Sequence, residues 1–283
     1  MEHLTAFLTR MPKVELHVHL ESTMPGEMLA RFAARQGREL PRPAERLYDC
    51  SAEDLSDFLA FLDNICSFVG TPEELAEAAE HAALESGREH ILYSEMILNP
   101  THWPQFTVPE IIAAATAGFD RAAARGGADC RFTLSLSRTQ TGAEAMALVE
   151  DMKAHRTHRL AGLSIDGNEA LAGRTGERFR PAFLAAKAAG FGRTAHAGES
   201  SGPDGVRDAL DLLDAGAAVT LSRDDPTFLG GLALTEELRR AAEFAGMSRE
   251  ELLACQEAAV DAAFCGPETK AFLRRALAEF RQS

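Results

Sequence analysis

The sequence of 283 residues lacks several features that would direct it to other classes of protein. It has no apolar run near the roughly 18 residues of a membrane-spanning helix, and its first ten residues show no signal-peptide pattern. We therefore expect a cytoplasmic protein with no membrane partner. No CxxC pair is present, which argues against a cysteine zinc site or a disulfide framework and predicts reduced, buried thiols. The cysteines are Cys50, Cys66, Cys130, Cys255 and Cys265.

Positive charge is also scarce, because 29 Lys and Arg stand against 43 Asp and Glu, for a formal net charge of −14. Non-specific binding to nucleic acid or anionic lipid needs a basic surface, so we expect neither partner. The 46% hydrophobic and 25% charged content is ordinary for a globular protein. A chain of this length can bury a sizeable core, and no linker divides it, so residues 1–283 are expected to form one domain.

Short apolar runs rich in β-branched residues alternate with longer Ala-rich amphipathic segments. The short runs predict strands at residues 14–20, 91–98, 132–137, 160–165, 192–196 and 218–222. The longer segments predict helices that include residues 73–86, 108–125, 143–153, 178–189 and 205–213. Repeated strand–helix units predict an α/β protein with a parallel sheet and helices outside it. Because a closed barrel of this class has eight strands, six candidates predict an incomplete TIM-barrel-like fold of about six βα units.

The segment at about 40–69 interrupts this alternation with extra helical turns. Its apolar positions are Leu55, Phe58, Leu59, Phe61 and Leu62. These side chains fit ordinary packing. They also fit a helical lid, because the segment follows the first strand and strand ends are where barrel enzymes place their chemistry.

Three histidines lie on or at the ends of predicted strands. Residues two apart on a strand point the same way, so His17 and His19 face one side together and make a natural pair of metal ligands. His196 ends the fifth predicted strand, and Glu199 follows in a loop of small residues. A carboxyl beside a metal-activated water can act as a general acid when its pKa is raised. Alone, each motif also fits a structural histidine and a surface carboxylate.

Two adjacent carboxylates, Asp224 and Asp225, follow the last predicted strand. Neighbouring carboxylates at the end of an apolar strand are costly unless something positive lies nearby. One of them can bind a cation while the other binds a substrate, because successive side chains diverge. An Asp-Asp-Pro sequence is equally common as a turn or the start of a helix.

Taken together and in this order, the motifs resemble the adenosine deaminase family of the amidohydrolase superfamily. Residues 12–21 (PKVELHVHLE) are similar to its opening motif, and residues 162–169 (GLSIDGNE) to its strand-4 segment. Residues 196–199 (HAGE) and 222–226 (SRDDP) are similar to its HAGE and (S/T)xDDP motifs. The resemblance covers nearly the whole chain.

The resemblance implies one divalent metal ion per chain, usually zinc, with a position left for water. Its ligands would be His17, His19, His196 and Asp224. Glu199 would protonate a ring nitrogen of an adenine-containing small molecule, which becomes a 6-oxopurine as ammonia leaves, and Asp224 would share in the catalysis. The Gly167 backbone would contact the purine edge, Asp225 would bind another ring nitrogen, and Glu21 would contact the sugar or close the site.

The sequence departs from the family after HAGE. A sixth-strand RIxHG motif, whose His positions the attacking hydroxide, and a seventh strand ending in a Pro-x-Ser-Asn-like segment are both absent. Only 28 positions separate His196 from Asp224, which is room for about one unit of roughly 30 residues. His102, after the second strand, is the nearest candidate substitute for the missing His. Ser22 replaces a usual Gly and Asp166 a small apolar residue, so the substrate need not be adenosine.

Three functions are therefore open. The first is an active deaminase of adenosine, adenine or a relative, and the second is hydrolysis of another C–N bond on the same metal. The third is an impaired relative that retains only metal or purine binding. Missing units would also leave barrel edges exposed, and a homo-oligomer that covers them is one way to close the wall.

Overall fold

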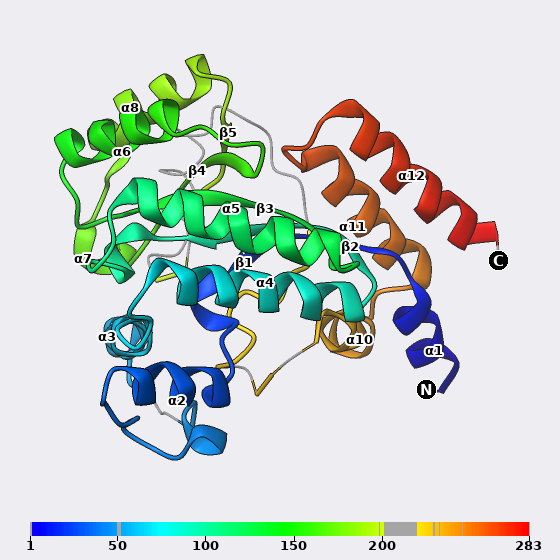
Figure 1. Cartoon of the computed structure of the whole chain (residues 1–283). Coiled ribbons are helices and arrows are strands. Elements are labelled where there is room, and N and C mark those ends of the chain that lie inside the picture. The colour runs from blue at the N-terminus through cyan, green and yellow to red at the C-terminus, as the bar shows by residue number, and fades with distance from the viewer. Residues whose placement is uncertain are drawn as a thin grey trace.

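Five parallel strands, hydrogen-bonded in chain order, form the centre of a computed structural model of the protein (Figure 1). The structure describes residues 2–49, 52–197, 199–200, 220–228, 230–231, 233–244 and 246–282. The strands are β1 (Lys13–His19), β2 (Ile91–Leu98), β3 (Asp129–Ser137), β4 (Leu160–Asp166) and β5 (Gly192–Arg193). The five strand predictions that precede residue 197 are confirmed, although β5 is shorter than expected. Beyond β5, backbone bonds from Thr194 and His196 to β4 continue the pairing without regular strand geometry.

Helices follow the strands. Those between β1 and β5 are η1 (Leu20–Ser22), α2 (Gly26–Arg35), η2 (Ala44–Arg46), α3 (Leu55–Cys66), α4 (Pro72–Arg88), η3 (Pro100–His102), α5 (Val108–Ala124), α6 (Gly142–Ala154), α7 (Glu169–Ala172) and α8 (Gly176–Ala188). Of these, α4, α5, α6 and α8 lie outside the sheet. The ends of the chain add α1 (Glu2–Arg10), α10 (Leu234–Phe244), α11 (Arg249–Ala262) and α12 (Pro267–Gln282). Capping boxes at Thr107, Thr141 and Ser248 fix where three of them begin. The helix predicted at 205–213 lies outside the described residues.

The core is divided into two clusters by the sheet. Helices α4, α5, α6 and α8 pack on one side with Met96, Leu134 and Leu163, and Figure 1 shows α4 and α5 lying side by side along the strands. The second cluster joins Val14 and Tyr93 to the terminal helices. Strands covered on both faces are nearly all apolar, which is why short apolar runs in the sequence predicted them. Of the cysteines, Cys66, Cys130, Cys255 and Cys265 are free and buried as predicted, and Cys50 lies outside the described residues.

The segment that carries Asp224 lies beside β1. Asp224 forms a parallel bridge with Val18, with backbone bonds from His19 N to Asp224 O (3.0 Å) and from Asp224 N to His17 O (3.3 Å). The sixth predicted strand is therefore reduced to one bridge among the described residues, and residues 218–219 lie outside them. Asp224 has a φ of +56°, a left-handed conformation that breaks an extended strand and that Asp tolerates better than most residues. A last strand beside the first is the arrangement of a closed barrel.

The turn between α11 and α12 crosses the inner side of the sheet. Phe264 donates its backbone N–H to Glu95 of β2, and its ring fills the space where a Cβ on Gly192 of β5 would stand. In a flat sheet β2 and β5 would lie about 14 Å apart at the usual strand spacing. One residue reaches both, so the sheet is curled like part of a barrel, and the C-terminal helices fill part of its inner side. Among the described residues, no helix is both long and apolar enough to cross a membrane.

Candidate metal centre and substrate pocket

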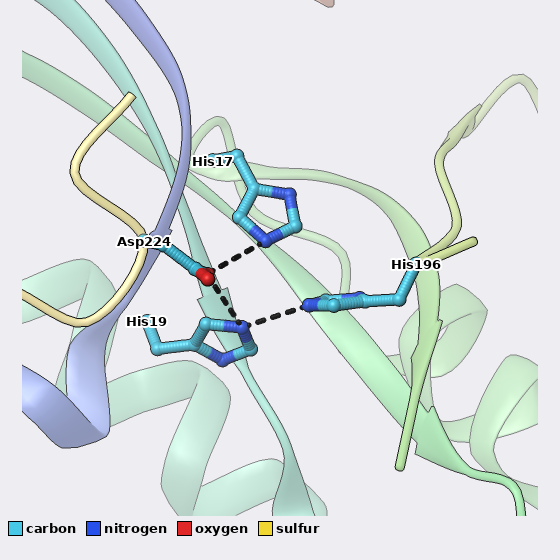
Figure 2. Close-up of side chains that lie close together, drawn as sticks. All are labelled: His17, His19, His196 and Asp224. Atoms are coloured by element: carbon cyan, nitrogen blue, oxygen red, sulfur yellow. Dashed lines mark hydrogen bonds and ion pairs between the residues drawn. The ribbon is translucent and has the colours of Figure 1, made fainter. Parts of the chain in front are cut away.

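Three histidines and one carboxylate converge from β1, the end of β5 and the Asp224 segment (Figure 2). One ligand atom from each of these residues lies within 4.8 Å of every other. His19 Nε2 is 2.9 Å from His196 Nε2, while Asp224 Oδ1 is 3.0 Å from His17 Nε2 and 3.6 Å from His19 Nε2. The structure thus brings together all four residues that the sequence proposes as ligands.

The donor set and its spacing fit a divalent metal ion. Zinc bonds of about 2.0–2.1 Å in a tetrahedron place the ligand atoms about 3.3 Å apart, and the three short separations here bracket that value. His196 Nδ1 lies 3.0 Å from the carbonyl oxygen of Ile165, which directs Nε2 toward the other ligands. Three nitrogens and one oxygen are a common zinc donor set.

The electrostatics of the cluster favour the protonation states that metal ligands need. Burial lowers the pKa of His19 to about 3 and, together with the neighbouring imidazoles, lowers that of His196 well below its ordinary value. Burial opposes the ionised form of Asp224, but the hydrogen bond from His17 and the nearby imidazoles outweigh it and lower the Asp224 pKa. The same contact raises the pKa of His17 against the effect of burial. Two imidazoles are thereby held neutral beside a carboxylate that is held ionised.

An ion pair between Arg223 and Glu15 fixes the segment that carries Asp224. The guanidinium donates to both carboxylate oxygens of Glu15, at 2.9 and 2.6 Å, and the Arg223 backbone N–H donates to the same carboxylate at 3.0 Å. The guanidinium also donates to the Glu89 carboxylate and to the Ser86 hydroxyl, both at 3.2 Å. Both side chains of the central pair are buried. The segment is therefore held against β1 and α4 with little help from strand pairing.

A pocket opens beside two of the four ligands, His19 and His196, which are part of its lining. Its polar lining includes Glu199, Asp225, Asp166 and His102, with Gly167 between them. Its apolar wall comes from α3, through Leu55, Phe58, Leu59 and Leu62. Gly167 has a φ of +97°, which an L side chain rarely adopts.

Two polar contacts and one aromatic cluster hold α3 over this pocket. Asp63 of α3 lies 2.5 Å from His102 Nδ1, and Ser56 accepts a bond of 3.0 Å from Asn168. Phe228, just after the Asp225 turn, packs edge-on against three aromatic rings. They belong to Tyr48, Phe58 and Phe61. Helix α3 is thus tied to the ends of β2 and β4 and to the segment that carries Asp225.

The loop that carries Glu199 is anchored on one side by Ser200. The Ser200 hydroxyl accepts from the backbone N–H of Glu169 at 2.9 Å, and its own N–H donates to the Glu169 carboxylate at 3.2 Å. Arg138 donates to the carbonyl oxygen of His196 at 2.6 Å and pairs with Glu169 at 3.3 Å. Burial and the nearby charge of Asp224 raise the pKa of Glu199, so this carboxyl holds a proton more readily than usual.

The two other carboxylates proposed from the sequence lie in different environments. Burial, followed by repulsion from Asp224, raises the pKa of Asp225 in the pocket wall. Glu21 is fully buried and does not line the pocket. Its Oε1 accepts from the backbone of Asn99 at 2.8 Å and from Trp103 Nε1 at 3.0 Å. The structure therefore places Glu21 behind the wall, where it braces the turn after β2.

Sequence reasoning missed several residues that build this site. Arg138 and Asn99 follow the ends of β3 and β2, so the rule that barrel enzymes place polar groups at strand ends could have identified them. Arg223 stands inside a recognised motif, but its partner Glu15 is more than 200 positions away. Without the fold, no local signal connects the two.

Comparisons with known proteins agree with this geometry. A model of the adenosine deaminase family matches residues 12–217. The chain is 27% identical to the adenine deaminase of Rhodospirillum rubrum, over 96% of this chain and 98% of that protein. It is 28% identical to that of Sinorhizobium fredii, over 94% and 98%. The alignment with the Rhodospirillum protein has 332 positions, whereas this chain has 283 residues. At least about 50 positions of that alignment therefore have no residue of this chain, which is close to two βα units of roughly 30 residues each.

Solved structures support the same assignment. An amidohydrolase from Burkholderia ambifaria with bound zinc superimposes with a TM-score of 0.88 at 25% identity, over 98% of this chain and 93% of that one. An adenine deaminase from Arthrobacter aurescens superimposes with a TM-score of 0.86 at 18% identity, over 96% and 100%, and this second likeness shows the fold alone. The incomplete TIM-barrel-like fold, the ordered motifs and the matched residues lead to one conclusion: the chain belongs to the adenosine deaminase family, whose members hydrolyse non-peptide C–N bonds.

Proposed function

We propose that the protein catalyses the zinc-dependent hydrolytic deamination of an adenine-containing small molecule, yielding the 6-oxopurine and ammonia. The observation that carries this proposal is the convergence of His17, His19, His196 and Asp224 beside a pocket that Glu199 and Asp225 also line. The relatives that this chain matches over almost their whole length are named adenine deaminases, which supports a purine substrate. The zinc in the Burkholderia amidohydrolase supports the choice of metal.

Each residue has a defined part in this reaction. When bound to the four ligands, the metal supplies Lewis-acid activation of the water that attacks the purine. Glu199, with its raised pKa, holds a proton and donates it to the ring nitrogen next to the reacting carbon. Asp225, also with a raised pKa, donates to a second ring nitrogen, and the Gly167 backbone contacts the purine edge. Glu21 closes the site from behind through Asn99 and Trp103.

The family's sixth-strand histidine, which positions the attacking hydroxide, has no counterpart in this sequence, so another residue would have to take its part. His102 lines the pocket, and although burial opposes its charge, the hydrogen bond with Asp63 and neighbouring carboxylates raise its pKa. We propose that His102 supplies positive charge to the pocket in place of that residue. The α3 segment acts as a lid over the substrate, and the reaction takes place in the cytoplasm, whose reducing conditions suit four free, buried thiols.

Metal analysis and a substrate assay test the proposal together. Purified protein should contain close to one zinc per chain and should remove the absorbance of adenine or a related 6-aminopurine as ammonia appears. Glu199→Gln should retain zinc but lose at least about 100-fold in rate, since general acid catalysis contributes about that much or more. Bound zinc without turnover of any purine would leave another C–N hydrolysis, and absence of both would leave only an impaired relative.

A further inference from the structure

The pocket contains a buried carboxyl group that none of the roles above uses. Asp166 ends β4, is 6% exposed and lines the pocket next to Gly167. Its Oδ1 accepts a 2.6 Å hydrogen bond from Asn99 Nδ2. Its Oδ2 is buried near the hydroxyl of Ser135, which lowers the Asp166 pKa, although neither atom makes a hydrogen bond of good geometry within the described part of the chain. Because a carboxylate oxygen can accept more than one hydrogen bond, Oδ2 can also take a donor from a ligand.

The ionised form of Asp166 lacks stabilisation in the structure. Burial raises its pKa, and His102, the Ser135 hydroxyl, Asn99 and Arg138 offset this only in part, so a hydrogen-bond donor on a bound molecule would favour the carboxylate that accepts it. A buried carboxylate oxygen is costly unless it has a partner, and a donor from a bound molecule offsets that cost. Asn99 holds the other oxygen, so the carboxyl cannot easily turn away. The group is therefore preorganised for one N–H or O–H donor on the substrate.

We infer that Asp166 selects the free purine base over its nucleosides by accepting the ring N–H that a nucleoside has lost to the sugar. This inference rests on the proposed deaminase function. With the reacting end of the purine at Glu199 and the metal ligands, and Asp225 on one ring nitrogen, the edge near Gly167 carries N3 and the adjacent N9. Free adenine presents N9–H to an acceptor there. In a nucleoside, N9 carries ribose and offers no donor.

The pocket wall agrees with a small substrate. Helix α3 closes it with four apolar side chains that offer no hydrogen bond to a sugar hydroxyl. Glu21, which the sequence assigns either to a sugar contact or to closing the site, does not line the pocket, and its Oε1 accepts from Asn99 and Trp103 instead.

Methylation at N9 isolates the contact. We compare kcat/KM for adenine, 9-methyladenine and adenosine in the wild-type protein, Asp166→Ala and the surface control Glu150→Gln, whose carboxylate is 59% exposed on α6. The wild type should prefer adenine to 9-methyladenine by about 10- to 100-fold, the worth of a hydrogen bond to a charged group. Asp166→Ala should lower the rate with adenine by about that factor and leave 9-methyladenine little changed, so that the preference disappears. Glu150→Gln should match the wild type.

Binding of the products gives a readout that does not require a stable variant. Titration calorimetry on the zinc-loaded wild type should give at least about tenfold tighter binding of hypoxanthine than of 9-methylhypoxanthine. Equal binding, equal rates with adenine and 9-methyladenine, or a preference for adenosine that Asp166→Ala weakens would each overturn the inference. If the wild type deaminates none of the three amines, the proposed function fails first, and the two failures are therefore distinguishable.

Discussion

The buried pair of Arg223 and Glu15 should decide whether Asp224 remains a metal ligand. Replacing Arg223 with Met removes four side-chain hydrogen bonds, two of them to Glu15. The Glu15 carboxylate has no exposed surface, so the change leaves it buried with the Arg223 backbone N–H as its one remaining partner among the described residues. Breaking a buried pair on one side costs about 3–5 kcal/mol. That is a large share of the roughly 5–15 kcal/mol that keeps a domain folded.

The effect on the metal is separate from the effect on folding. Asp224 follows Arg223 directly and joins β1 through a single bridge, so little else holds its carboxylate near His17 and His19. Loss of a partner that orients a metal ligand typically weakens metal binding about 10- to 100-fold. We therefore expect Arg223→Met to lower the free energy of unfolding by about 3–5 kcal/mol and to weaken zinc binding by one to two orders of magnitude.

Urea unfolding of the metal-free protein and zinc competition with a chelator measure the two effects independently. Arg274→Met is the matched control, because Arg274 pairs with Asp261 in an exposed ion pair on the outer helices, where such pairs contribute about 0–1 kcal/mol. A Glu15→Leu/Arg223→Met double variant should recover much of the stability, since no charge is left buried, but not the zinc affinity. If Arg223→Met unfolds more easily yet binds zinc as tightly as the wild type, the positioning argument is wrong.

Three further predictions follow from the same structure. Removing the metal with a chelator should lower the midpoint of thermal unfolding, and zinc at about 100 times its Kd should restore about 2.7 kcal/mol; no change on either step would contradict a metal site at the four ligands. Asp63→Asn should weaken the contact of α3 with His102 and raise KM about threefold to tenfold. The effect should be no larger, because the Asp63 side chain is 58% exposed and exposed pairs are weak. An unchanged KM would show that this contact does not hold α3 over the pocket. Burial raises the pKa of Glu95 to about 7, so the folded state retains a proton that the unfolded state releases near pH 4.5. The free energy of unfolding should therefore fall by ~3 kcal/mol as the pH rises from about 4.5 to about 7. Glu95→Gln should flatten this dependence in urea titrations at several pH values, and a pH dependence equal to that of the wild type would contradict the prediction.

Much of the fold could be predicted because the relevant signals are local. A strand buried on both faces is nearly all apolar, and helices such as α5 begin at a threonine three residues before a glutamate. The predicted ends of α4, α5, α6 and α8 differ from the observed ends by at most two residues. The strand predicted at residues 218–222 is an exception, because its described residues, 220–222, form no regular strand. Its apolar sequence is ordinary, but the left-handed backbone of Asp224 and the side-chain anchor at Arg223 replace the ladder that such a sequence usually forms.

The site was predictable where chemistry follows strand ends, and less so where it depends on contacts distant in sequence. His17 and His19 alternate on one strand, so their common direction follows from strand geometry alone. From the sequence, Asp166 stood out only as a departure from the family pattern. Its contacts with Asn99 on one oxygen and its place near Ser135 on the other become visible only in the fold. The place of Glu21 behind the wall depends on Trp103, whose position relative to β1 no sequence pattern encodes.

The missing units and the surviving ligand set are compatible because a barrel metal site uses only part of the wall. The ligands come from the first strand, the fifth strand and the segment that borders the first, and their spacing depends on β1 more than on what stands between β5 and that segment. Backbone bonds to Val18 and its neighbours, together with the ion pair to Glu15, attach Asp224 directly to β1. If the two units that the spacing predicts to be missing lie after β5, their loss removes part of the wall without moving the ligands apart. The sixth-strand histidine would be lost with these units. We therefore expect a lower rate of the chemical step and a zinc affinity that is largely unchanged.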